Sequence, residues 1–172
     1  LVQLPMTVHE LGYDVFHNCI NLKSIELPES LTTISGNAFR GTGLQSITIP
    51  ANVTNVELRA FRFCEDLTEV IFTGSMPYIA DSAFDGVTAT VYYPGEDTSW
   101  EHAIGNHYGG NLTWVPVFDY VDEGTCGDNL TWHLRQDGTL IIKGSGAMDD
   151  YGANSAPWSG YKSQIVDVQM DG

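Results

Sequence analysis

The chain has 172 residues, of which 42% are hydrophobic and 17% are charged. This composition is typical of a folded globular protein and excludes an intrinsically disordered one. The formal net charge of −15 disfavours binding to nucleic acids or to anionic membranes, because such a surface repels phosphate groups. No stretch of the sequence approaches the roughly 18 apolar residues of a membrane helix, so we expect no membrane insertion.

The first half of the chain is dominated by a repeat. Its aromatic position is occupied by Phe16, Phe39, Phe61 and Phe84, and the steps between them are 23, 22 and 23 residues. Further apolar positions recur in the same phase, at Leu22, Leu44 and Leu67, at Ile25, Ile47 and Val70, and at Leu27, Ile49 and Phe72. A single unit of this length cannot bury its own apolar residues, whereas stacked units bury them together. The sequence therefore predicts a mainly β, leucine-rich-repeat solenoid over residues 1–94, with about four units of which the first is partial.

Each unit combines a short strand with an arc that returns the chain to the next unit. Residues 24–27 alternate polar and apolar side chains, which predicts a strand with one buried face in a parallel sheet. Pro28 then ends the strand, because it has no N–H to donate. Leu31 and Ile34 have a spacing that suits a turn or a short strand-like arc. We expect one helical turn at residues 37–39 to place its aromatic ring in the core.

Residues 95–118 follow the repeats and are predicted to be a capping segment or linker. The last units of solenoids are often irregular, because they cover the core with a polar face. Within this segment, residues 100–107 are expected to form a short helix that Gly109 and Gly110 end.

Residues 119–164 have a different pattern and predict a small β-rich module. The segments Leu130–Leu134 and Thr139–Lys143 are predicted strands, and the Asp-Gly pair between them is a strong signal for a β-hairpin. In such a hairpin, alternation places Trp132 and Leu134 on the buried face.

The last residues of the chain repeat the spacing of the first half. Ile165-x-x-Val168-x-Met170 has the same separations as Leu22-x-x-Ile25-x-Leu27. We therefore expect residues 165–172 to open a further repeat that is cut short, so that the chain begins inside one repeat and ends inside another.

The repeat resembles the BspA-like leucine-rich repeats of bacterial surface proteins. The resemblance is carried by Phe16-x-x-Cys19-x-x-Leu22-x-x-Ile25-x-Leu27-Pro28-x-x-Leu31-x-x-Ile34 with Ala38-Phe39, by Ala60-Phe61-x-x-Cys64-x-x-Leu67 and by Ala83-Phe84. It covers residues 1–94, and residues 119–164 are similar to a small module that accompanies such repeats. The resemblance implies an extracellular or cell-surface protein that binds a host extracellular protein or a bacterial surface protein, with no catalysis and no cofactor.

The residue types that usually carry chemistry form no recognisable motif in this sequence. Cys19 and Cys64 hold the same position two units apart, about 10 Å at a strand spacing of ~4.8 Å, which is beyond the reach of a disulfide. We interpret both as small buried apolar residues, and Cys126 has no evident partner. CxxC, HExxH and nucleophile-elbow motifs are absent from the sequence, so we predict no catalytic residue and no metal site. A weak calcium site at Asp149 and Asp150 stays open as a hypothesis.

The outward face of the predicted sheet is the candidate binding surface. Its residues alternate with the buried strand residues and stack from unit to unit: Ser24, Glu26, Ser46, Thr48, Glu69, Ile71 and Tyr92. Ile71 and Tyr92 place apolar or aromatic side chains where solvent is expected, which indicates contact with a partner. The alternative is that Ile and Tyr simply favour an exposed strand.

Three functions fit these observations. The first is a non-enzymatic adhesion or recognition scaffold that binds a host or bacterial surface protein through the sheet face. The second is a structural spacer or stalk in a large surface protein. The third is a carbohydrate-binding accessory module, which requires exposed aromatic rings at Trp132, Tyr151 or Trp158. In each case we expect a monomer outside the cell.

Overall fold

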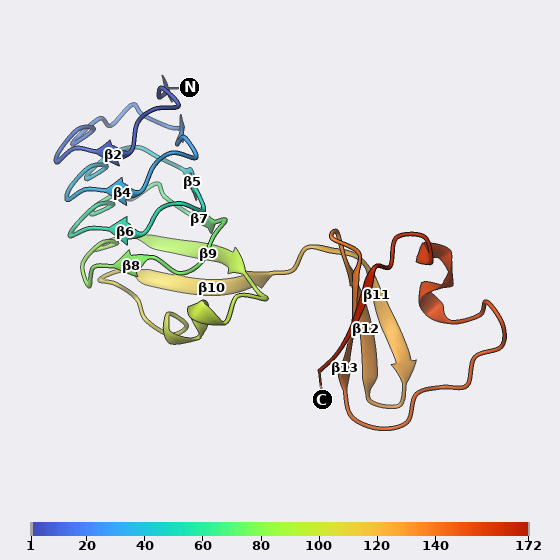
Figure 1. Ribbon diagram of the computed structural model, residues 1–172. Helices are drawn as coiled ribbons and strands as arrows, with labels where there is room; N and C mark the ends of the chain where they lie inside the picture. The colour runs from blue at the N-terminus through green and yellow to red at the C-terminus, as the bar shows by residue number, and fades with distance from the viewer. Residues whose placement is uncertain (1, 172) are drawn as a thin grey trace. The chain divides into compact units, whose positions relative to one another are not determined.

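The computed structural model describes residues 2–171, which fall into two compact units (Figure 1). The first unit, Leu1–Phe118, is the repeat solenoid, and the second, Asp119–Gly172, is the β module. Parallel strands build the solenoid and a largely antiparallel sheet builds the β module, in agreement with the predicted fold class. No helix in the described part of the chain is both long and apolar enough to cross a bilayer.

One face of the solenoid is built from six strands, of which the last four are the longer ones. They are β1 (Val2–Gln3), β3 (Ile25–Glu26), β5 (Ser46–Ile49), β7 (Glu69–Phe72), β9 (Thr88–Pro94) and β10 (Asn111–Val117). The last four form one parallel sheet in the order β5-β7-β9-β10, and β1 and β3 form a two-stranded parallel sheet. The register aligns Ile47 with Val70 and Val70 with Val91, so equivalent positions of successive units lie side by side. The predicted parallel sheet is confirmed.

A second parallel sheet lies in the return arc of each unit. Its strands, in order across the sheet, are β2 (Glu10–Leu11), β4 (Thr33–Ile34), β6 (Asn55–Val56) and β8 (Tyr78–Ile79). In each strand the second residue is buried and the first is not, so every strand supplies one apolar side chain to the core. The arc predicted from the spacing of Leu31 and Ile34 is thus a short strand.

A ladder of stacked phenylalanine rings joins the units. The ring centroids are 5.4 Å apart for Phe16 and Phe39, 5.3 Å for Phe39 and Phe61, and 5.1 Å for Phe61 and Phe84, and the ring planes lie within 13° of parallel. The main chain beside the rings pairs as well, because the Phe39 N–H donates to the Ala60 carbonyl at 2.8 Å. Residues 37–39 therefore place their ring in the core as predicted, but they form successive turns bonded to the next unit rather than a helical turn.

The last turn of the solenoid departs from the prediction. The helix expected at residues 100–107 is wrong, because a 3-10 helix, η1, covers only Thr98–His102. Asp97 starts η1 by accepting a backbone hydrogen bond at 2.9 Å. Gly105, at φ +93°, takes the chain out of the helical region before the Gly-Gly pair that was expected to end the helix. The chain then forms β10, a strand that the sequence analysis does not predict.

The β module is an antiparallel sheet extended by one parallel strand. Strands β11 (Tyr120–Gly127), β12 (Leu130–Arg135), β13 (Thr139–Gly144) and β14 (Asp167–Asp171) lie side by side in this order, and a 3-10 helix, η2 (Pro157–Tyr161), precedes β14. The first three strands pair antiparallel, whereas β14 pairs in parallel with β13. The predicted hairpin is confirmed, with Trp132 and Leu134 buried at 3% and 0% exposure.

Candidate recognition surface

The register of the four-stranded sheet arranges the outward side chains into two rows. One row runs through Ser46, Glu69 and Thr90, and the other through Thr48, Ile71 and Tyr92. Strand β10 extends these rows with Thr113 and Val115. The structure thus brings together the five predicted residues that lie on β5, β7 and β9.

The other two predicted residues lie apart from these rows. Ser24 precedes β3 and Glu26 lies in it, and β3 pairs with β1 in the separate two-stranded sheet. Both side chains are exposed, as are those of Ser46 and Thr48. The continuous part of the face therefore begins at β5 and runs toward β10.

Apolar side chains occupy neighbouring places in one of these rows. Ile71, Tyr92 and Val115 are registered partners on β7, β9 and β10, and we call them the apolar strip. Neighbouring strands are about 4.8 Å apart, so the three side chains shield one another, and each is half-buried. The sequence analysis misses Val115 because it places residues 95–118 in a cap. The alternation of Leu112 and Trp114 is the signal that marks β10.

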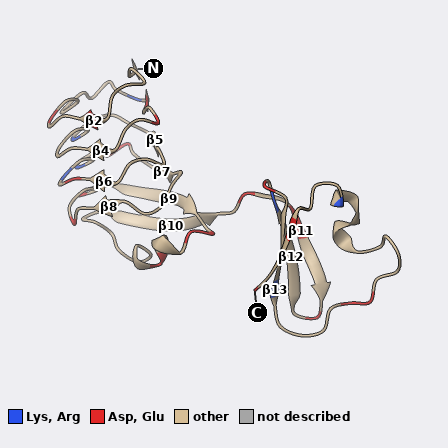
Figure 2. Cartoon of the chain, in the orientation of Figure 1, with Lys and Arg blue, Asp and Glu red and all other residues tan. Residues whose placement is uncertain are grey.

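The apolar strip belongs to a strongly acidic chain. The sequence holds 22 acidic and 7 basic residues, and Figure 2 shows the acidic positions spread over both units. The half-buried Glu69 lies on the same strand as Ile71, in the row beside the apolar strip. A partner that buries the strip would therefore meet negative charge at its border.

Residues 1–97 match the family model described as BspA type leucine rich repeat region, in six copies. This segment is more than half of the 172 residues and contains the phenylalanine ladder. The chain belongs to the BspA-type leucine-rich-repeat family. The resemblance seen in the sequence is confirmed, with six copies where the period predicts about four units. No curated protein and no solved structure gives a significant match to the chain.

The BspA-type repeat is a protein-interaction fold, generally non-enzymatic and typical of bacterial surface proteins. The match ends at residue 97, so it does not extend to the β module. Among the described residues, no three or more His, Cys, Asp or Glu side chains are grouped as a metal ion would require. Asp149 and Asp150, at which a weak calcium site is a hypothesis, are both exposed.

The turns of the BspA-type repeats carry another exposed aromatic ring, which sequence analysis misses. Phe63 is 43% exposed and adopts φ +58°, a backbone conformation that costs a bulky residue roughly 1–2 kcal/mol. Asn18 and Gly41 hold the same position in the preceding units, two residues after the ladder phenylalanine, and tolerate positive φ better. The guanidinium groups of Arg40 and Arg62 lie 5.9 and 4.4 Å from the Phe63 ring centroid. A phenylalanine where the repeat otherwise has Asn or Gly is the signal for this feature.

The two cysteines of the BspA-type repeats differ in exposure, which corrects one prediction. Cys64 is fully buried, its thiol donates to the Phe39 carbonyl at 2.9 Å, and burial raises its pKa. Cys19, predicted to be buried in the same way, is exposed. The reason is that the preceding unit covers Cys64, with the Thr42 hydroxyl 3.3 Å from its sulfur. No preceding unit within residues 2–171 covers Cys19.

Three side chains on the β module are arranged in the order carboxylate, imidazole, hydroxyl, as in a catalytic triad. The Nδ1 atom of His133 lies 2.9 Å from a Glu123 carboxylate oxygen, and its Nε2 atom lies 3.0 Å from the Thr131 hydroxyl. Glu123 and His133 are registered partners on β11 and β12, so the pairing of these strands by itself brings the two side chains together. We therefore assign this arrangement to strand pairing.

Three aromatic residues of the β module pack together at its core. The Trp132 ring lies 5.9 Å from the Trp158 ring, which lies 6.1 Å from the Tyr151 ring, each measured between centroids. All three pack in the cluster that contains Cys126 and Leu134. Trp132 is buried and Tyr151 and Trp158 are half-buried, so none of the three is the fully exposed ring that the carbohydrate-binding alternative requires.

Proposed function

We propose that this chain is a recognition scaffold of an extracellular bacterial surface protein, and that it binds a host or bacterial surface protein through the sheet face. The observation that carries the proposal is the apolar strip, Ile71, Tyr92 and Val115, set among polar side chains on adjacent strands. Protein-binding hot spots have this arrangement, with apolar or aromatic anchors at the centre and a polar rim.

The proposal also draws on the rigidity and the charge of the surface. The strip lies on paired strands above a buried layer, in which Ile47 and Val70 are 2% and 0% exposed, so its side chains need little ordering on binding. The net charge of −15 favours a partner with a basic surface and faster encounter with it at low salt.

The test is binding of the purified chain to immobilised extracellular-matrix proteins, bacterial surface proteins and glycans at physiological salt. The variant Ile71→Ala/Tyr92→Ala should lose affinity about tenfold or more, because it removes two central contacts. The matched control is Ile20→Ala/Tyr78→Ala, which removes two side chains that are 66% and 67% exposed and lie outside the apolar strip. This control should bind as the unaltered chain does.

Three results would count against the proposal. Equal losses in the two double variants would mean that the apolar strip is not the contact. Binding to glycans alone would move recognition to another part of the chain. An absence of saturable binding to any protein would favour the alternative of a structural spacer.

A further inference from the structure

The last strand of the β module leaves its apolar side chains open to solvent. Val168 and Met170 are 52% and 69% exposed, and Val166, which directly precedes the strand, is 77% exposed. They are not isolated surface residues, because the register places Val168 beside Leu140 and Met170 beside Ile142, which are 2% and 5% exposed. Registered partners share one face of a sheet. The buried apolar rows of the module therefore continue onto β14 and remain uncovered there.

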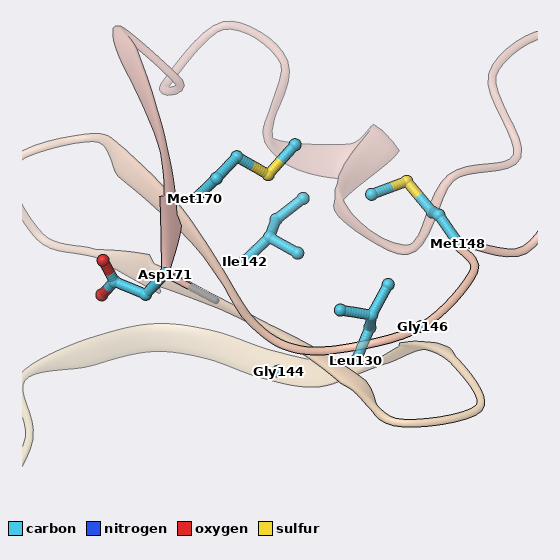
Figure 3. A pocket seen from close by; sticks show the side chains of 7 residues that line it. All are labelled: Leu130, Ile142, Gly144, Gly146, Met148, Met170 and Asp171. Carbon is cyan, nitrogen blue, oxygen red and sulfur yellow. The ribbon is translucent and has the colours of Figure 1, made fainter.

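A hollow next to β14 is also lined mainly by apolar side chains. It is lined by the apolar side chains of Leu130, Ile142, Met148 and Met170, with Gly144 and Gly146 at its rim. Figure 3 shows the four apolar side chains around one space, while the Asp171 carboxylate points away from it. Methionine side chains adapt readily to the shape of a partner.

The strand that borders this hollow has the sequence spacing of the repeats. Val168 and Met170 correspond to Ile25 and Leu27 in Ile165-x-x-Val168-x-Met170 and Leu22-x-x-Ile25-x-Leu27. Strand β14 also joins its neighbour in parallel, as do the strands of the solenoid and unlike the other strands of the module.

The solenoid shows what covers these two positions when a further unit is stacked. Their counterparts in β5, Ile47 and Ile49, are 2% and 0% exposed, with β7 paired in parallel beside them. Those in β7, Val70 and Phe72, are 0% and 4% exposed.

We propose that β14 is a repeat-type strand whose free edge accepts a leucine-rich-repeat unit continuing directly from it. The β module then serves as the starting cap of a repeat array. The incoming unit pairs its strand in parallel with β14, covers Val168 and Met170, and closes the hollow. A second copy of the chain is the poorer occupant, because each copy carries a net charge of −15 and β14 itself bears Asp167 and Asp171.

The test extends the full chain in the phase of the repeat. Since Met170 corresponds to Leu27, a second copy of residues 28–118 is joined directly after Met170. The matched control carries the same segment after residue 172, through a flexible Gly/Ser linker of about 20 residues. The measurement is hydrogen exchange of the β14 amides, with exchange in β12 and β13 reporting that the module is folded in both proteins.

In the phase-matched protein, the β14 amides should exchange about tenfold more slowly than in the control. Adding Val168→Asp/Met170→Asp to it should abolish this protection while β12 and β13 stay protected. Equal exchange in the two extended proteins would overturn the proposal. Protection in the unextended chain that rises with concentration, together with a dimer in sedimentation, would also overturn it by identifying a second copy as the occupant.

Discussion

Strands β10 and β14 each end a sheet by parallel addition, yet only one of them is covered. On β10, the Trp114 ring packs with those of Trp100, Tyr93 and Tyr108, at centroid distances of 5.9 to 6.2 Å. On β14, the apolar side chains are more than half exposed. The difference shows that main-chain pairing alone does not bury the apolar face of the last strand in a parallel sheet. A layer of side chains must also cover the apolar face of its last strand.

The indole N–H groups of the aromatic residues that cover β10 are both hydrogen-bonded. The indole N–H of Trp100 donates to the Gly74 carbonyl at 3.1 Å, and that of Trp114 donates to the Asn106 carbonyl at 2.9 Å. A buried indole without such a partner would lose part of what its ring gains by burial. Residues 95–118 therefore cover the last units of the solenoid with η1, β10 and their aromatic rings, rather than with the longer helix expected at residues 100–107.

The comparison between β10 and β14 is tested most strongly by removing the Trp100 ring, which packs over β10. Trp100→Ala should lower the free energy of unfolding of the solenoid by about 3–5 kcal/mol, because Trp100 is fully buried among aromatic rings. Met170→Ala on the uncovered β14 should change stability by no more than about 0.5 kcal/mol. Urea unfolding followed by circular dichroism measures both. Equal effects would break the distinction between a covered and an uncovered last strand.

A smaller effect is expected at Gly138, in the turn between β12 and β13, which lies beside the segment that leads into β14. Gly138 has φ +85°, and a Cβ there would lie 2.3 Å from the Gln164 carbonyl oxygen. Gly138→Ala should destabilise the β module by about 2 kcal/mol or more, since backbone strain and a clash add together. It should also speed hydrogen exchange in β14, because the Val166 N–H bonds to the Gly138 carbonyl at 3.0 Å.

Gly146 provides the control for this substitution. It has φ +128° and open space where a Cβ would lie, so Gly146→Ala carries the backbone strain without the clash. Faster exchange in β14 for both variants would show that the effect does not come from the hydrogen bond between Val166 and Gly138.

The smallest expected effect concerns the start of η1 in the cap of β10. Hydrogen bonds from Ser75 and Ser99 lower the pKa of Asp97 below its usual value. Because the pKa is lower in the folded state, this stabilisation is present above the unfolded pKa, near 4, and is lost as pH falls through the folded value. Asp97→Ala should cost about 1 kcal/mol at neutral pH and less in acid.

The matched control is Glu65→Ala, which removes an exposed carboxylate elsewhere on the solenoid. Unfolding curves at neutral pH and below pH 4 compare the two variants. A cost for Asp97→Ala that did not shrink in acid would show that the charge of this carboxylate does not stabilise the cap.

Local pattern was enough to predict the parts of the molecule that repeat. The period of the phenylalanines predicted stacked units with the aromatic ring in the core, and alternation in residues 24–27 predicted the parallel sheet. Alternation also predicted the hairpin and its buried Trp132. Five residues of the candidate binding face were placed together for the same reason, since each repeats the phase of the one before.

The tertiary structure decided what covers each element, and that depends on neighbours that no local pattern names. Cys19 and Cys64 hold the same phase, but only Cys64 has a unit covering it. Val115 joins the apolar strip only because β10 pairs with β9. Val168 and Leu140 share one row of one sheet, yet one is exposed and the other is buried. Periodicity determines which side of a strand is apolar, whereas burial depends on whether another part of the fold lies against that side.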